Sequence, residues 1–130
     1  MTLFKPVEEN KASAKVKKIY NTIKKERKIK FIPNFWKTIA NDPETLERTW
    51  TTLNQVMKKG ALDPLTKELL YIAVSMTNSC EYCIRSHSAA AKKKGMSEKM
   101  LKELIAVVGM ANETNKLVEA DQVEVDNFLK

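Results

Sequence analysis

The chain has 130 residues and a mass of 14.8 kDa; 43% of the residues are hydrophobic, 30% are charged, and Gly and Pro number only 3 and 4. This composition fits one globular domain over residues 1–130 with a single core, and it excludes collagen-like, mucin-like and wholly disordered chains. No apolar run approaches the about 18 residues needed to cross a bilayer, and the first residues lack the pattern of a secretory leader, so we expect a cytoplasmic protein without a membrane partner.

The net charge of +7 comes from the first third of the chain. Residues 1–40 hold 11 Lys and Arg against 3 Glu, whereas residues 41–130 hold 12 basic against 13 acidic residues. Apolar side chains recur every three or four residues between about Val7 and Lys28, which predicts a basic N-terminal helix at about 7–28 with one buried face. This segment lacks zinc-finger and helix-turn-helix spacing and has only Tyr20 as an interleaved aromatic residue. The pattern favours a solvated lysine face over a nucleic-acid partner.

Prolines and glycines mark the helices in the middle of the chain. A short aromatic segment follows Pro33, and Asn41-Asp42-Pro43 then caps a helix that extends to about Lys59. We expect Gly60 to end that helix in a left-handed conformation. The sequence Leu62-Asp63-Pro64 begins the next helix, whose apolar face continues to Met76.

Three more helices are predicted in the last third. The first begins at about Cys80 and stops at Gly95, the second is capped by Ser97 and reaches about Val108, and the third lies between about Asn112 and Leu129. No segment alternates with period two, so we expect no sheet and an all-α bundle. The segments 65–76 and 80–94 should form a helical hairpin.

Two cysteines stand three residues apart, followed by the single His of the chain. On a helix, Cys80, Cys83 and His87 share one stripe, so both sulfurs and the imidazole can touch. Cys80 falls in the first turn, where the positive end of the helix dipole favours a thiolate. His87 can act as a base for Cys83 or as a cation that favours its thiolate. The same spacing permits a disulfide.

A carboxylate is expected beside this stripe. If the chain reverses at Asn78 and Ser79, Glu68 lies within about one helical turn of the level of His87. Glu68 has apolar neighbours, so it is a candidate buried carboxylate that orients the imidazole of the base. The alternative is an ordinary surface carboxylate paired with a lysine; the twelve-residue spacing from Cys80 favours the relay.

A C-x-x-C pair also occurs in zinc sites and in thioredoxin-like proteins. With one His and one cysteine pair, a closed zinc site would need Glu68 or a ligand from another subunit. A thioredoxin-like motif needs a flanking strand, which the pattern does not predict. His87 could also be a satisfied core residue, but its spacing from Cys83 argues against that. We therefore predict no metal and interpret the cysteines as chemically active.

The stretch from Glu68 to Gly95, ELLYIAVSMTNSCEYCIRSHSAAAKKKG, resembles the core of the AhpD-like alkylhydroperoxidases in the carboxymuconolactone decarboxylase superfamily. The family signature is a Glu, a C-x-x-C twelve residues later, a His four residues after the second Cys and a Gly near the helix end, and all are present. The upstream FIPNFWKTIANDP and GALDPLTKE also look like that family, so the resemblance covers residues 30 to 110 or so.

The resemblance implies an AhpD-like helical bundle with the C-x-x-C at the N-terminus of a central helix, assembled as a homo-oligomer, usually a trimer or hexamer. It implies that Cys83 attacks a hydroperoxide, that Cys80 resolves the product as a redox-active disulfide, and that Glu68 and His87 relay protons. It also implies an external dithiol reductant, resembling a lipoyl-bearing protein, and no metal or flavin cofactor. Tyr82 stands where the best-known members have a further His, so Tyr82 is a candidate relay or pocket residue.

These expectations lead to a thiol-dependent peroxidase that reduces hydroperoxides in antioxidant defence. An alternative is a thiol-disulfide oxidoreductase or redox-sensing stress protein without efficient peroxidase turnover, which the departure at Tyr82 keeps open. Another is a binding protein that uses its basic arm, with incidental cysteines. Lactone decarboxylation is not expected, because family members with that activity generally lack the cysteine pair.

Overall fold

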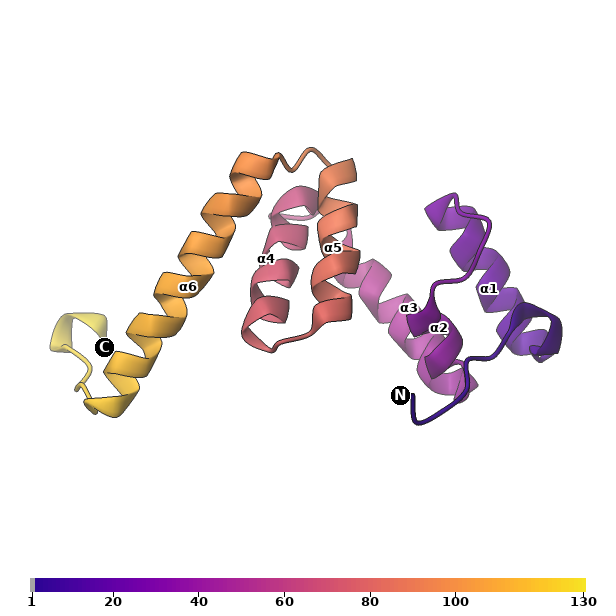
Figure 1. The fold of residues 1–130 in the computed structure, drawn as a ribbon, viewed down its shortest axis with the longest axis horizontal. Coiled ribbons are helices and arrows are strands. Elements are labelled where there is room, and N and C mark those ends of the chain that lie inside the picture. The colour runs from indigo at the N-terminus through magenta and orange to yellow at the C-terminus, as the bar shows by residue number, and fades with distance from the viewer. Residues whose placement is uncertain (1) are drawn as a thin grey trace. The chain divides into compact units, whose positions relative to one another are not determined.

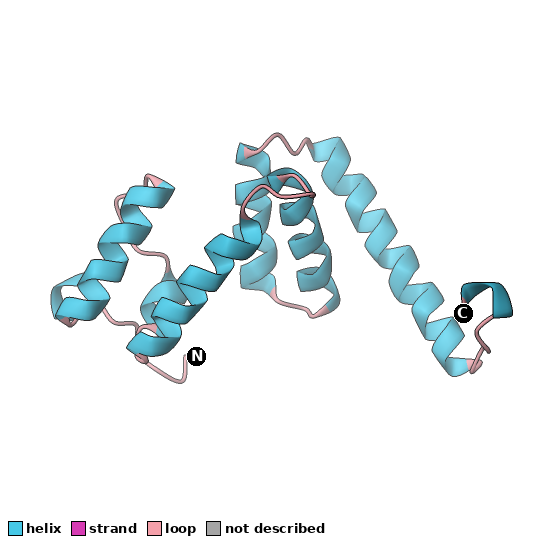
Figure 2. Cartoon of the chain, turned by 180° about the vertical axis from the view of Figure 1, so that it is seen from behind, coloured by secondary structure: helices cyan, strands magenta, loops and turns pink. Residues whose placement is uncertain are grey.

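The computed structural model describes residues 2–130, which form helices and connecting segments without a strand (Figures 1 and 2). The α-helices are α1 (Ala14–Arg27), α2 (Asn34–Ile39), α3 (Pro43–Met57), α4 (Pro64–Thr77), α5 (Glu81–Lys93) and α6 (Glu98–Ala120), and single 3₁₀ turns cover Glu9–Lys11 and Asn127–Leu129. The predicted all-α class is therefore confirmed. The described chain divides into two compact units, one ending at Val56 and one from Met57 to Lys130.

The first unit is built on α1, α2 and α3. Its core contains Tyr20, Ile23 and Leu46 together with two tryptophans, Trp36 and Trp50, whose rings meet edge to face with centroids 5.2 Å apart. Burial of such large aromatic side chains contributes several kcal/mol each to the stability of a core, about 3–5 kcal/mol by truncation to Ala. This unit therefore has its own hydrophobic core.

Helix α1 carries the basic face that the charge pattern predicts. Val16 is buried with Tyr20 and Ile23, whereas Lys17 and Lys18 are exposed. The helix begins at Ala14 and not near Val7, because the Ser13 side chain accepts a hydrogen bond from the backbone N–H of Val16 and so caps the helix there. The predicted start of the basic helix is therefore corrected by seven residues.

The expectation for Gly60 is wrong. Helix α3 ends at Met57, and among residues 2–130 the glycine with a positive φ is Gly95. The Gly60 N–H donates to the carbonyl oxygen of Leu62 at 3.2 Å, so a bend there replaces the left-handed cap. Helix α4 then starts as predicted, because the Asp63 side chain accepts from the N–H of Thr66 at 2.9 Å.

The second unit contains the α4 and α5 hairpin, in which the two helices lie side by side and are joined by a tight turn (Figure 1). Its buried core consists of Ile72 of α4, Ala91 of α5 and Met96. Partly buried apolar side chains surround this core: Leu65, Leu69, Met76, Met100, Leu101 and Leu104. The predicted hairpin is present. Buried side chains thus form two clusters instead of the expected single core, while the assignment of the whole chain to one domain stays a prediction.

Helix α6 replaces the two helices predicted after Ser97. Gly109 continues the helix, and the Asn112 side chain donates to the Val108 carbonyl at 2.8 Å and to the Thr77 hydroxyl at 3.1 Å instead of capping a new helix. The helix ends at Ala120 and not at Leu129. Within residues 2–130 no helix has the length and the apolar character that a membrane crossing requires.

Candidate functional site

The turn between α4 and α5 determines where the first cysteine lies. Ser79 adopts a left-handed conformation with φ of 56°, its N–H donates to Met76, and the N–H of Cys80 donates to the carbonyl of Ser75 at 2.9 Å. These two bonds satisfy the free carbonyls at the end of α4, as in a Schellman motif. Cys80 is at the same time the N-cap of α5. The backbone of two helices therefore fixes its position.

The two cysteines form a disulfide at the start of α5. Their Cα atoms are 5.3 Å apart, and the Cys80 sulfur accepts a hydrogen bond from the backbone N–H of Cys83 at 3.4 Å. Both residues are partly exposed. Free N–H groups and the positive end of the dipole are found at this terminus, and they favour a thiolate when the pair is reduced. An external thiol can reach a sulfur in this position.

A buried carboxylate faces the imidazole, as the hairpin argument predicts. Oε2 of Glu68 lies 2.7 Å from Nδ1 of His87, and Glu68 is only 4% exposed. With Glu68 ionised, Nδ1 carries the proton and donates it to the carboxylate. The other ring nitrogen, Nε2, is then left for proton exchange. Cys83 and His87 lie one turn apart on α5.

Lys94 is a second partner of the carboxylate, which the sequence reasoning missed. Its Nζ donates to Oε1 of Glu68 at 2.6 Å. Burial acts to raise the pKa of Glu68, but the hydrogen bonds from His87 and Lys94 and the positive charge of Lys94 outweigh it and hold the pKa below its ordinary value. The carboxyl group is therefore ionised at neutral pH. The signal in the sequence was the spacing of seven residues, two helical turns, between His87 and Lys94.

Tyr71 is a second residue of the site that the sequence reasoning did not place there. Its ring stacks on the imidazole of His87 with centroids 3.7 Å apart. Tyr71 follows Glu68 by three residues, so both side chains leave α4 from one face. That spacing could have identified it.

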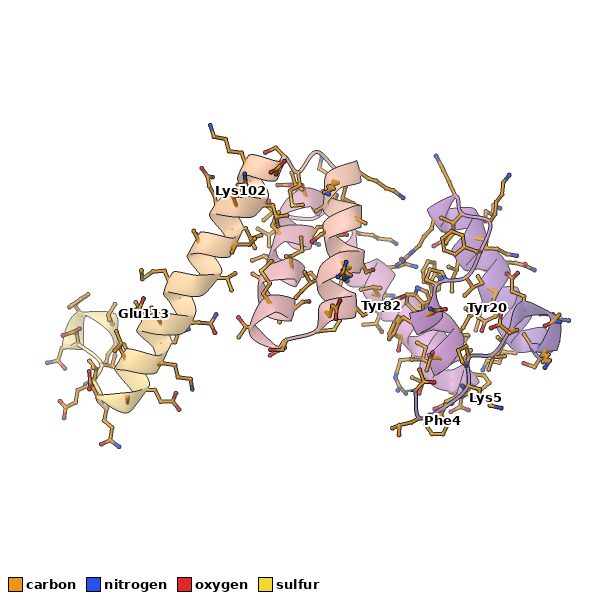
Figure 3. The ribbon with its side chains drawn as sticks, viewed as in Figure 1. Phe4, Lys5, Tyr20, Tyr82, Lys102 and Glu113 are labelled. Atoms are coloured by element: carbon orange, nitrogen blue, oxygen red, sulfur yellow. A yellow bond between two sulfur atoms is a disulfide. The ribbon has the colours of Figure 1, made fainter. Side chains whose placement is uncertain are left out.

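Tyr82 lies between the two cysteines near the N-terminal end of α5, where its side chain is 47% exposed (Figure 3). A residue in this position can contact a substrate or a partner that approaches from solvent. Its assignment as a relay or pocket residue stays a prediction. Within the described part of the chain, no three side chains of His, Cys, Asp or Glu form a set that could hold a metal ion.

Comparison with known proteins connects this arrangement to a family. The model of the carboxymuconolactone decarboxylase family matches residues 43–123, which include helices α3 to α6 and all the residues of the site. A crystal structure of the alkylhydroperoxidase AhpD core from Rhodospirillum rubrum is similar to the whole chain: the sequences are 43% identical, the TM-score is 0.93, and the match covers 100% of this chain and 98% of that one.

Two curated relatives are named alkyl hydroperoxide reductase AhpD. The one from Solibacter usitatus is 35% identical over 72 residues, which is 55% of this chain, and the one from Corynebacterium aurimucosum is 28% identical over 68 residues, which is 52% of this chain. The matched segments span 39% and 38% of the length of those two proteins. The similarity is thus to a part of each.

Proposed function

The chain belongs to the carboxymuconolactone decarboxylase family, and on that premise we propose that it is a thiol-dependent peroxidase of the AhpD type that reduces hydroperoxides in antioxidant defence. One observation carries the proposal. A partly exposed disulfide between Cys80 and Cys83 begins the same helix that places His87 against the buried carboxylate of Glu68. A reactive sulfur, a base and the group that orients the base are the components that nucleophilic catalysis needs.

The reaction begins with the reduced pair. The thiolate of Cys83 attacks one oxygen of the hydroperoxide, the O–O bond breaks, and the alkoxide leaves and takes up a proton to become an alcohol. Cys83 is then a sulfenic acid, oxidised by two electrons. The thiol of Cys80 attacks that sulfur, and water leaves as the disulfide forms. An external dithiol reduces the disulfide by thiol-disulfide exchange and is itself oxidised.

His87 supplies the proton transfers in this scheme. Its Nε2 accepts the proton of the Cys83 thiol and returns one to the departing alkoxide. Glu68 holds the Nδ1–H, which keeps the ring in the tautomer whose Nε2 has a lone pair. The roles of the four residues are supported by the Glu68 to His87 contact and by the spacing along α5.

The reductant in this proposal is a dithiol. The family resemblance implies that a lipoyl-bearing protein supplies it. No metal or flavin takes part in the proposed cycle. A reducing compartment supplies such dithiols, so we place the protein in the cytoplasm.

We also propose that the chain forms a homo-oligomer, a trimer or a hexamer. Exposed apolar side chains on α6, including Val107, Met110 and Leu117, support this assembly.

The test is consumption of an organic hydroperoxide by the purified chain with dihydrolipoamide as reductant. We expect turnover, and we expect Cys83→Ser to abolish it. Ser86→Ala, which changes an exposed residue between Cys83 and His87, is the matched control and should keep the activity of the parent chain. A parent chain and a Cys83→Ser variant with equal rates would contradict the proposal.

A second candidate is a redox sensor or thiol-disulfide oxidoreductase that uses the same sulfurs. The observation that favours it is Tyr82, which occupies the place between the cysteines where the relay of the best-known members has a further His. In that case one equivalent of peroxide forms the disulfide and a dithiol opens it again, but catalytic consumption of peroxide stays near the rate of the uncatalysed reaction. The same assay distinguishes the two.

A further inference from the structure

Lys94 is a charged residue that the proposed reaction does not use, although it contacts the carboxylate of the relay. Its Nζ lies 2.6 Å from Oε1 of Glu68, while Nδ1 of His87 lies 2.7 Å from Oε2. Each oxygen of one buried carboxylate therefore has its own nitrogen partner. The Lys94 side chain is 37% exposed, so its ammonium group can stay hydrated on one side while it neutralises Glu68 on the other.

The end of α5 fixes the backbone position of Lys94. Lys94 is the C-cap residue of α5, and the chain turns directly after it through Gly95, which has φ of 105°. The N–H of Met96 donates to the carbonyl of Ala91 at 2.9 Å, and Ala91 is completely buried. The backbone around Lys94 is fixed in this way, and its Nζ lies within hydrogen-bond distance of Glu68 from that position.

A buried carboxylate needs a positive partner, since an unpaired charge is costly to bury. His87 can supply that charge only as an imidazolium, which has no lone pair and cannot act as a base. Lys94 supplies it permanently at neutral pH. With Lys94 in place, Glu68 can be ionised and balanced while His87 stays neutral, with a proton on Nδ1 and a lone pair on Nε2.

We propose that Lys94 is a positioning residue of the relay: it supplies the counter-charge of Glu68, so that His87 is left neutral and able to accept a proton at Nε2. The inference rests on the proposed function, because it concerns the base of that reaction. It adds a residue outside the Glu, Cys, Cys and His pattern. The depressed pKa of Glu68, to which Lys94 contributes by hydrogen bond and by charge, agrees with this role.

Several other polar groups of α4 and α5 have partners of their own or carry no charge. On α4, the Lys67 ammonium donates to the carbonyl of Lys58, and Tyr71 contributes a neutral ring. On α5, the two sulfurs are joined in a disulfide and do not titrate, and Arg85 pairs with Glu81. On α6, Met100, Leu101 and Leu104 pack against the neighbouring core of Ile72, Ala91 and Met96. Lys94 is therefore the cation that the structure places on the carboxylate.

The experiment follows the imidazole directly. His87 is the single His of the chain, so proton NMR of the disulfide form of the full chain gives one set of imidazole signals. In Lys94→Met, the imidazolium has to balance Glu68, and we expect the titration midpoint of these signals to move up by about one pH unit. Lys94→Arg keeps the charge and should restore the midpoint of the parent chain.

Lys93→Met is the matched control, because it removes the same charge from the neighbouring position. We expect its midpoint to differ from that of the parent by less than about 0.2 pH unit, since exposed charges are screened by solvent and salt. Equal shifts in Lys93→Met and Lys94→Met would overturn the proposal, because they would show a general effect of net charge. An unshifted midpoint in Lys94→Met would also overturn the proposal, provided that cooperative unfolding shows the variant to be folded.

If Lys94→Met does not fold, Lys94→Gln makes the same comparison, since Gln keeps a donor for Oε1 without a charge. The titration needs no peroxide, so a chain that shows the shift but has no turnover contradicts the proposed function and not the role of Lys94. If the chain does turn over, the rate of Cys83 oxidation can be measured as a function of pH. The acid limb of this profile should shift between the parent and Lys94→Met by the same amount as the imidazole midpoint.

Discussion

The ring of Tyr71 lies nearly parallel to the imidazole of His87, with centroids 3.7 Å apart and an angle of 21° between the planes. Glu68 leaves the same face of α4 one turn earlier and holds the edge of that imidazole through Nδ1. One helix therefore restrains the imidazole in two ways, by a hydrogen bond in its plane and by a ring against its face. An oriented base loses less entropy when it takes part in proton transfer.

The first prediction concerns this stack. Tyr71→Phe keeps an aromatic ring against His87, whereas Tyr71→Leu removes it. We expect Tyr71→Leu to slow the oxidation of Cys83 by peroxide about fivefold, which corresponds to the about 1 kcal/mol of an aromatic pair, and Tyr71→Phe to match the parent chain. Stopped-flow fluorescence measures this rate. If both variants are slowed equally, the hydroxyl group and not the stack is responsible.

The second prediction concerns stability in acid. Burial acts to raise the pKa of Glu68, but the hydrogen bonds from His87 and Lys94 and the positive charge of Lys94 lower it by more, so that it lies below the value of about 4.5 expected in the unfolded chain. Such a carboxyl group contributes stability above the unfolded value, and this contribution is lost as the pH falls through the folded value. We expect Glu68→Gln to be less stable than the parent by about 2 kcal/mol at pH 7.

Urea unfolding between pH 3 and pH 7 measures this difference. It should shrink below the unfolded pKa of Glu68, because the parent then loses the contribution that the variant lacks. Glu98→Gln breaks an exposed ion pair with Lys102 and serves as the control, with a change of less than about 0.5 kcal/mol. A constant difference between parent and Glu68→Gln down to pH 3 would contradict the assignment.

The third prediction separates the two cysteines. In Cys80→Ser, Cys83 can still attack a hydroperoxide but has no neighbouring thiol to form a disulfide. We expect one equivalent of peroxide to be consumed and a sulfenic acid to accumulate on Cys83, visible by mass spectrometry as one added oxygen atom or as an adduct with dimedone. A sulfenic acid that accumulates instead on Cys80 of Cys83→Ser would reverse the roles of the two residues.

The fourth prediction concerns the exposed apolar residues of α6. Val107 is 67% exposed, and Ile105 and Met110 are about half exposed on the same helix. Contact with another copy of the chain would remove this apolar surface from water. We expect Val107→Asp to lower the mass measured by sedimentation equilibrium to that of a monomer. Asn115→Asp adds the same charge at an exposed polar position and should leave the mass of the parent unchanged; a parent chain that is itself monomeric would contradict the homo-oligomer.

Local signals predicted most of the helices. Asp63 and Ser97 cap the starts of α4 and α6 with their side chains, and α5 stops before Gly95, each as expected from the sequence. Two other local signals misled. Gly60 has no left-handed conformation, and Asn112 bonds within α6 where it was expected to begin a helix. Gly and Asn can adopt several local conformations and hydrogen bonds of similar energy, and the residues packed around them in the fold decide which one forms.

The amino-acid sequence by itself determined the spacing of Cys80, Cys83 and His87 along one helix and the register that brings Glu68 to the imidazole, because both follow from the period of the α-helix and the position of one turn. Only the tertiary structure decided which lysine meets Glu68. Lys92, Lys93 and Lys94 are consecutive and chemically identical, and successive residues of a helix point about 100° apart. The packing of α5 on α4 sets the direction of each, and it turns Lys94 toward the carboxylate.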